Sequence, residues 1–196
     1  MAFVTVTDRT AADVAYLQTL KAKIQSRTAS ASELAEWLAG LKGAYNASDM
    51  NRVGEDIDYL YTLMQTVPAT ISAYLESIGV APDEKFVLSI DLPAALTPKT
   101  DWTSVDIPTA AQLAEYLGNV LALRDAVALG NPPNFPASMA ALDYRGANAI
   151  EQLLVNINAY LVDGEAEMEG RADRAAASWV YCGQPPCGLV NLQFGG

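Results

Sequence analysis

Apolar residues recur at spacings of three and four positions along most of this chain, which is the pattern of amphipathic helices. The stripes that precede Gly79 run over residues 14–24, 34–41, 53–64 and 71–78. Thr10 and Ser30 each stand three residues before an acidic residue, the spacing of a capping box that starts a helix. Pro68 is expected to end the third helix, because proline lacks the N–H that a helix interior needs. The first 79 residues therefore predict four helices.

The chain changes character after Gly79. Prolines punctuate residues 80–105, and the apolar run 86–90 is consistent with a short strand or an extended connection. Helical spacing resumes after Thr109, where Gln112 completes another capping box, and a long final helix is predicted from near Tyr144. The segment from Trp179 onward is rich in glycine, proline, valine and aromatic residues, which favours turn and strand.

These segments predict a mainly α fold of about six helices, arranged as two similar helical units with a short β-like C-terminal tail. The expected boundaries are 1–79 for the N-terminal unit, 80–105 for an extended connector, 106–170 for the second helical unit and 171–196 for the tail. A weak internal repeat supports two units. Residues 10–14 parallel 109–113, and the spacing of Asn51, Val53, Ile57, Leu60 and Met64 recurs in Asn148, Ile150, Leu154, Ile157 and Leu161. Because amphipathic helices align readily with one another, duplication and coincidence both stay open.

Composition narrows the possible functions. The chain has 196 residues, of which 51% are hydrophobic, and it carries a net charge of −11. Such an acidic surface repels phosphate groups, so nucleic acid and anionic membranes are unexpected partners. The sequence contains no histidine, which excludes a Ser-His-Asp triad, a Cys-His dyad and every imidazole metal site. We find no signal peptide and no apolar run long enough to span a bilayer, so the expected product is a soluble cytoplasmic chain.

The segment 42–53 (KGAYNASDMNRV) allows two interpretations. Lys42, Tyr45, Asn46 and Arg52 could form a ligand site at a helix N-terminus, where backbone donors favour anions. Alternatively Tyr45 packs, Asn46 or Ser48 caps the helix, and Arg52 pairs with Glu55 or Asp56 on the next turn. The second interpretation is simpler and is preferred.

Three other groups of residues are of types that can carry chemistry. The acidic clusters Glu55, Asp56, Asp58 and Glu165, Glu167, Glu169 are better explained as solvated helix faces than as a catalytic pair. The three tryptophans, Trp37, Trp102 and Trp179, are interpreted as packing anchors rather than as a sugar-binding platform. Cys182 and Cys187 could close a small disulfide loop or remain reduced thiols. No metal or cofactor site is predicted.

Several motifs together resemble a family of minor structural proteins encoded in the tail regions of Firmicutes phages and prophages. They are Asp8-Arg9-Thr10, the stretch 37–46, Asp49-Met50-Asn51-Arg52-Val53, residues 106–109, residues 116–120, residues 136–139 and residues 147–151. The likeness covers most of residues 8–181. The family carries no catalytic residues that could be transferred, so the resemblance implies a virion component made in the cytoplasm of a host bacterium.

The predicted function is therefore structural: a non-enzymatic protein of a phage tail, baseplate or fibre that assembles with itself or with other tail proteins. A receptor- or glycan-binding adaptor is the first alternative, and a carboxylate-dependent cell-wall hydrolase is the second. The apolar C-terminal segment has few charged neighbours, which is typical of an interface. Its candidate interface residues are Trp179, Tyr181, Leu189, Val190, Leu192 and Phe194.

Overall fold

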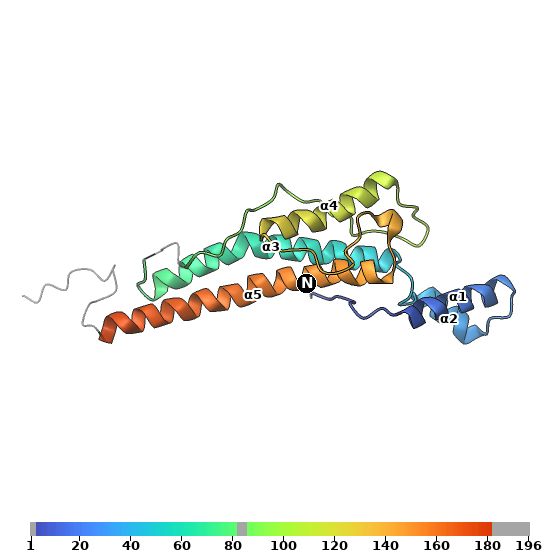
Figure 1. Ribbon diagram of the computed structural model, residues 1–196, viewed down its shortest axis with the longest axis horizontal. Coiled ribbons are helices and arrows are strands. Elements are labelled where there is room, and N and C mark those ends of the chain that lie inside the picture. The colour runs from blue at the N-terminus through green and yellow to red at the C-terminus, as the bar shows by residue number, and fades with distance from the viewer. Residues whose placement is uncertain (1–2, 82–85, 182–196) are drawn as a thin grey trace, which may run out of the picture. The chain divides into compact units, whose positions relative to one another are not determined.

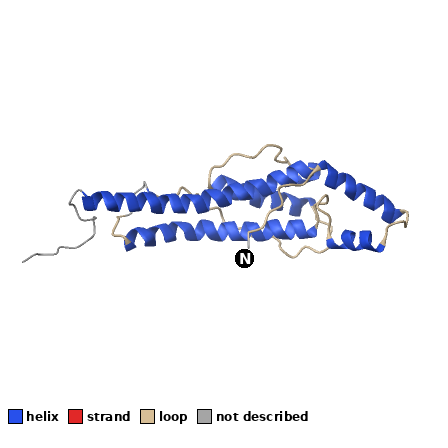
Figure 2. Ribbon diagram, turned by 90° about the horizontal axis from the view of Figure 1, so that it is seen from below, coloured by secondary structure: helices blue, strands red, loops and turns tan. Residues whose placement is uncertain are grey.

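A computed structural model describes residues 3–81 and 86–181, and these residues are mainly helical. The α-helices among them are α1 (Ala11–Gln25), α2 (Ala31–Ala39), α3 (Ala47–Ser77), α4 (Ala110–Ala126) and α5 (Tyr144–Tyr181). A short 3₁₀ helix, η2 (Met139–Ala141), precedes α5. The described ranges contain no strand, as Figure 2 shows. The expected mainly α fold is confirmed, with five α-helices in these ranges instead of about six.

The capping boxes read from the sequence form as predicted. At α1, the Asp13 N–H donates to Thr10 Oγ1 over 3.2 Å, and the Thr10 N–H donates back to the Asp13 carboxylate over 2.7 Å. Ser30 with Glu33 starts α2 in the same reciprocal way, and Thr109 with Gln112 starts α4. These boxes are predictable because a cap depends only on residues three positions apart.

Helix α3 continues through Pro68, so the prediction that this proline ends the third helix is wrong. Pro68 itself is exposed, whereas Met64, Val67 and Ile71 on either side of it are at most 3% exposed. Burial of one continuous apolar stripe therefore outweighs the hydrogen bond that the proline removes. The two helices expected here are one, which explains the lower helix count.

Helix α5 runs to Tyr181, about ten residues beyond the point where a β-like tail was expected to begin. That part of the prediction is wrong for residues 171–181, and Trp179 belongs to the helix. Met168 and Ala172 are buried and continue the apolar stripe of α5. Glu167 forms an ion pair of 2.6 Å with Arg171, which lies one helical turn after it. Both features favour helix over strand. Residues 182–196 lie outside the described residues.

The chain groups into two compact units, each assembled from two stretches of sequence. Unit 1 comprises Met1–Tyr61 and Pro93–Ile157, and unit 2 comprises Thr62–Leu92 and Asn158–Gly196. The long helices α3 and α5 each contribute residues to both units. This grouping differs from the predicted order of consecutive segments, because a long helix can leave one core and enter another without a break.

Unit 1 contains a helical core and a hairpin. Figure 1 shows α1 and α2 as the hairpin, in which Leu20 is fully buried. The core is filled by side chains of α3, α4 and α5. Its fully buried members are Val53, Ile57, Leu60, Val120, Leu123, Ile150, Leu153, Leu154 and Ile157. All of them lie on the stripes that the apolar spacing predicted.

Unit 2 is built on the C-terminal parts of the two long helices. Its buried side chains include Met64, Val67, Ile71, Leu75, Leu88, Leu161, Met168 and Ala172. Leu88 belongs to the non-helical connector and packs against Gly164, where a Cβ atom would lie 2.7 Å from Leu88 Cδ1. The expectation of an extended connection at residues 86–90 is met, and a glycine in α5 makes room for it.

Candidate functional site

The C-terminal residues proposed from sequence as an interface lie mostly outside the described residues. This applies to Leu189, Val190, Leu192 and Phe194, and also to the two cysteines, Cys182 and Cys187. Trp179 and Tyr181 are in the last turn of α5. The interface and the disulfide therefore stay predictions.

Residues 42–46 precede α3 and residues 47–53 form its first turns, and the structural interpretation of this segment is confirmed at the cap. Asn46 Oδ1 accepts from the Asp49 N–H over 3.3 Å, and the Asn46 N–H donates to Asp49 Oδ2 over 3.0 Å. The prediction that Arg52 pairs with Glu55 or Asp56 is not met by its closest ion pairs. Arg52 pairs instead with Asp49 at 2.6 Å and with Glu151 of α5 at 2.7 Å.

Four charged side chains form a ring of alternating sign in unit 1. Arg9 Nη2 lies 2.8 Å from both Asp49 Oδ1 and Glu151 Oε1. Arg52 Nη2 contacts the same two oxygen atoms and closes the ring. The side chain of Glu151 is fully buried and that of Arg9 is 2% exposed. Because the ring carries no net charge and each member is hydrogen-bonded, these ions can remain in the interior.

The hydrogen-bonding capacity of Glu151 is filled. Its Oε1 accepts from both arginines, and its Oε2 accepts from the Val6 N–H and from Arg52 Nε. Burial alone acts to lower the pKa of Arg52, but the hydrogen bonds that Arg52 donates to Glu151 and Asp49 raise it above its ordinary value. A carboxylate held by this many donors is positioned to bind the N-terminal segment to the helices, and we interpret the ring as structural.

Asp56 is a further buried carboxyl group, in addition to Asp49 and Glu151, and it contacts the N-terminal segment. Its Oδ1 accepts from the Val4 N–H over 3.2 Å, and its Oδ2 has no hydrogen-bond partner among the described residues. Burial, helped by repulsion from Glu151, raises the pKa of Asp56 to about 7. Asp56 therefore changes charge near neutral pH.

Two asparagines hold extended backbone in the same way. Asn148 of α5 accepts from the Arg9 N–H over 3.1 Å and donates to the Arg9 carbonyl over 2.8 Å. Asn51 of α3 accepts from the Trp102 N–H over 2.7 Å and donates to the Trp102 carbonyl over 2.9 Å. We call residues 3–9 the N-terminal strap and residues 99–102 the connector strap.

The register of the two straps is also the same. Three residues after Asn148, Glu151 accepts from the N–H of Val6, which is three residues before Arg9. Gly54 lies three residues after Asn51, and Lys99 lies three residues before Trp102. A Cβ atom at Gly54 would lie 2.7 Å from the carbonyl oxygen of Lys99. The strap before α1 is thus held by α5, and the strap before α4 is held by α3. Asn51 and Asn148, which the predicted repeat pairs, therefore make matched contacts with the two straps.

Sequence reasoning missed Arg9 and Glu151 as partners. The two residues are 142 positions apart, so no local spacing connects them. A signal for Glu151 was present, because it lies among Ile150, Leu153 and Leu154 on the apolar stripe of α5. A charged residue on a buried helix face needs an opposite charge from elsewhere in the chain.

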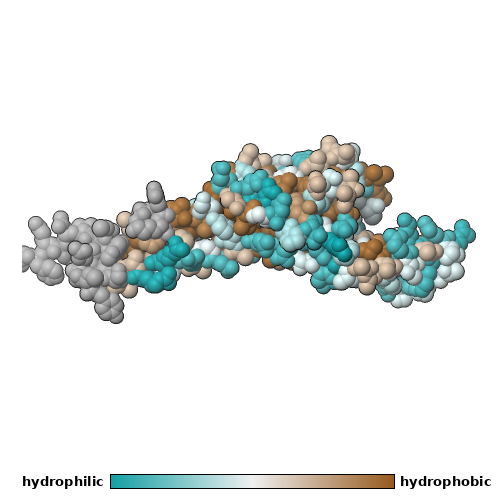
Figure 3. Space-filling view, viewed as in Figure 1, coloured by the Kyte–Doolittle hydropathy of each residue, from teal (hydrophilic) through white to brown (hydrophobic). Residues whose placement is uncertain are grey.

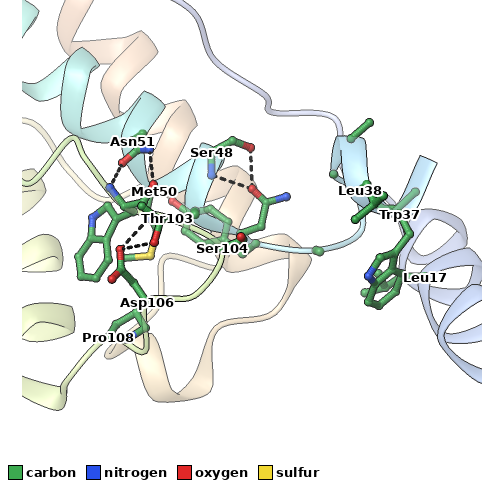
Figure 4. A pocket seen from close by; sticks show the side chains of 18 residues that line it. Leu17, Trp37, Leu38, Ser48, Met50, Asn51, Thr103, Ser104, Asp106 and Pro108 are labelled. Atoms are coloured by element: carbon green, nitrogen blue, oxygen red, sulfur yellow. Dashed lines mark hydrogen bonds between the residues drawn. The ribbon is translucent and has the colours of Figure 1, made fainter. Parts of the chain in front are cut away.

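Unit 1 also contains a groove of about 630 Å³. Figure 4 shows Leu17, Trp37 and Leu38 of the hairpin on one side, and Met50 and Asn51 of α3 on the other, together with Thr103, Ser104, Asp106 and Pro108. Trp102 and Tyr45 also line the groove, together with polar side chains that include Ser48 and Asp106. Trp102 is buried, and its Nε1 atom has no hydrogen-bond partner among the described residues.

The rim of this groove exposes large apolar side chains. Leu38 is 85% exposed and Trp37 is 37% exposed, and no residue of α2 is buried. Val105 and Ile107, which alternate with lining residues, are 84% and 90% exposed. On the molecular face in Figure 3, hydrophobic residues lie among hydrophilic ones. Exposed apolar side chains that gather around a hollow are typical of an interaction surface.

No cluster of three or more cysteine or acidic side chains in residues 3–81 and 86–181 is arranged to hold a metal ion. None of the helices in these ranges has both the length and the apolar character required to cross a bilayer.

Comparisons with known proteins do not assign this chain to a family. No family model matches it, and neither a curated protein nor a solved structure is significantly similar.

Proposed function

We propose that this chain is a non-enzymatic structural protein of a phage virion, associated with the tail, baseplate or fibre, and that it acts by assembling with itself or with neighbouring tail proteins. The exposed apolar rim of the unit 1 groove is the observation that carries this proposal. Burying such side chains against another protein releases about 25 cal/mol for each Å² of apolar surface removed from water. The motifs shared with tail-region proteins supply the virion context.

The charged ring fits a component of an assembly. The four members of the ring form ion pairs with one another, so their role is to stabilise the fold. Contacts with partner proteins would then be made by other residues, at the surface. Glu151 of the ring accepts from the Val6 N–H of the N-terminal strap, and Asn51 holds the connector strap. Fixed connecting segments of this kind suit a scaffold.

The proposal is tested by measuring assembly and location. Light scattering on the full chain over increasing concentration should show a mass above that of one chain, and antibodies against the chain should label the tail of purified phage particles. Deleting residues 179–196, which include the predicted interface, should lower the measured mass. A chain that stays monomeric at every concentration, captures no tail protein and is absent from particles would contradict the proposal.

A glycan- or receptor-binding adaptor is the second candidate, and one observation favours it. The groove combines the aromatic residues Trp37, Tyr45 and Trp102 with the polar side chains of Asn46 and Asp106. Aromatic faces with a few polar groups suit sugar rings. Binding on a glycan array that disappears in a Trp37→Ala variant would support this function.

A further inference from the structure

Helix α2, which lines the groove in unit 1, is amphipathic, but its apolar side chains are not buried by the rest of the chain that the structure describes. Helix α2 presents Leu34, Trp37 and Leu38, which are 42%, 37% and 85% exposed. On the opposite side of the groove, Asn51 holds the backbone of Trp102 with two hydrogen bonds. A preformed wall facing an exposed apolar helix is a suitable receptor for an apolar chain segment, since little order is lost on binding.

The chain itself contains such a segment. Residues 175–196 are its longest stretch without a charged side chain, although the whole chain carries a charge of −11. Cys182–Gly196, which lie outside the described residues, include four large apolar residues, Leu189, Val190, Leu192 and Phe194. An uncharged segment can approach another acidic copy without the repulsion that a charged one would meet.

We propose that the unit 1 groove binds the C-terminal segment, residues 182–196, of a second copy of this chain. This inference rests on the proposed assembly function and names its contact. The apolar residues of the segment would cover Leu38 and Trp37, and its backbone would reach polar side chains of the groove such as Ser48 and Asp106. A groove on one copy and a segment on the next make a head-to-tail contact, which builds a ring or an open chain of copies.

The native cysteines provide a direct test. Cys182 and Cys187 are the two cysteines of the chain, so a thiol-reactive photocrosslinker attaches within the C-terminal segment once both are reduced. The labelled chain is mixed with a ¹⁵N-labelled copy carrying Cys182→Ser and Cys187→Ser, irradiated and analysed by mass spectrometry. We expect crosslinks to residues 34–51 and 102–108 of the ¹⁵N copy. Crosslinks elsewhere, or only within one copy, would overturn the inference.

A pair of matched variants tests the groove. Leu38→Asp puts a charge at the rim on a side chain that is 85% exposed, so the fold should tolerate it. It should weaken binding of a fluorescent peptide of residues 182–196 to the full chain by about ten-fold or more. Val87→Asp, at a 62% exposed position in unit 2, is the control and should bind the peptide as the native chain does. Equal loss in both variants, or no loss in Leu38→Asp, would overturn the inference.

The outcomes separate this inference from the proposed function. If the chain assembles and labels particles but the crosslinks miss the groove, the groove contact is wrong and the structural function stands. If the peptide is displaced by a glycan and the copies do not associate, the groove belongs to the adaptor function and the inference fails.

Discussion

At the scale of single residues, Glu151 is the side chain on which the buried ring depends most. Replacing it by glutamine keeps its shape but leaves Arg9 and Arg52 with only Asp49 between them as a buried anion of the ring. Because an unbalanced buried charge is costly, Glu151→Gln should lower the free energy of unfolding by about 3–5 kcal/mol in urea titrations. Glu167→Gln, which breaks the exposed pair with Arg171, is the control and should change it little. Similar effects of the two variants would contradict the structural role of the ring.

Asp56 should make stability depend on pH near neutrality. Its pKa is about 7 in the folded protein, against 3.8 for an ordinary aspartate, so the folded state holds more protons between these values. The contribution of Asp56 to the free energy of unfolding is therefore fully present below pH 4 and is lost as the pH rises through 7. The asparagine of Asp56→Asn stays neutral at every pH. The free energy of unfolding of this variant, minus that of the native chain, should therefore increase by at least about 1 kcal/mol from pH 5 to pH 8. A constant difference between the two proteins would contradict the raised pKa.

At the scale of elements, Pro68 should destabilise α3, and the packing of the flanking apolar residues should compensate for this loss. Pro68 is exposed, so alanine can replace it without loss of a core contact. Restoring the N–H and removing the ring clash should raise the free energy of unfolding by about 1–3 kcal/mol, after allowance for the more flexible unfolded chain. Urea denaturation followed by circular dichroism measures the change. A clear loss of stability would mean that Pro68 is needed for a bend in the helix.

The two asparagine contacts should act separately on the two straps. Asn148→Ala removes both hydrogen bonds to Arg9, and Asn51→Ala removes both hydrogen bonds to Trp102. Each variant should lose about 1–3 kcal/mol of stability. Hydrogen exchange of the Arg9 amide should accelerate most in Asn148→Ala, and that of the Trp102 amide most in Asn51→Ala. Each variant thus serves as the control for the other, and equal acceleration of both amides in either one would contradict independent straps.

These elements also show which features a sequence can predict. The caps at Thr10, Ser30 and Thr109 formed as expected, because each depends on residues three apart. The continuation of α3 through Pro68 could not be predicted, since it depends on what the flanking apolar residues pack against. The same is true of the Arg9–Glu151 pair, whose partners meet only after the helices have come together.

At the scale of the whole molecule, the apolar spacing predicted the buried faces of α3, α4 and α5, but neither the exposure of the α2 stripe nor the division of the buried residues into units. Stripes on α3 and α5 look uniform along the sequence, yet Leu60 is in the core of unit 1 and Met64, one turn later, is in unit 2. Apolar spacing identifies a helix face that is suited to burial, but it does not identify the residues that will cover that face. The groove is equally hidden in the sequence, because its lining comes from the hairpin, the start of α3 and the connector.

The net charge of −11 leads to a prediction about assembly. Copies of this chain repel one another through their acidic surfaces, while the proposed contact joins uncharged and apolar groups. Raising the salt concentration from about 20 to about 300 mM shortens the screening length to well below 10 Å, which weakens the repulsion and leaves the apolar contact intact. Association measured by light scattering should therefore strengthen with salt, and Leu38→Asp should remain weaker than the native chain at both concentrations. An assembly held by ion pairs would show the opposite trend, because screening weakens attraction between opposite charges, and that result would reject an apolar interface.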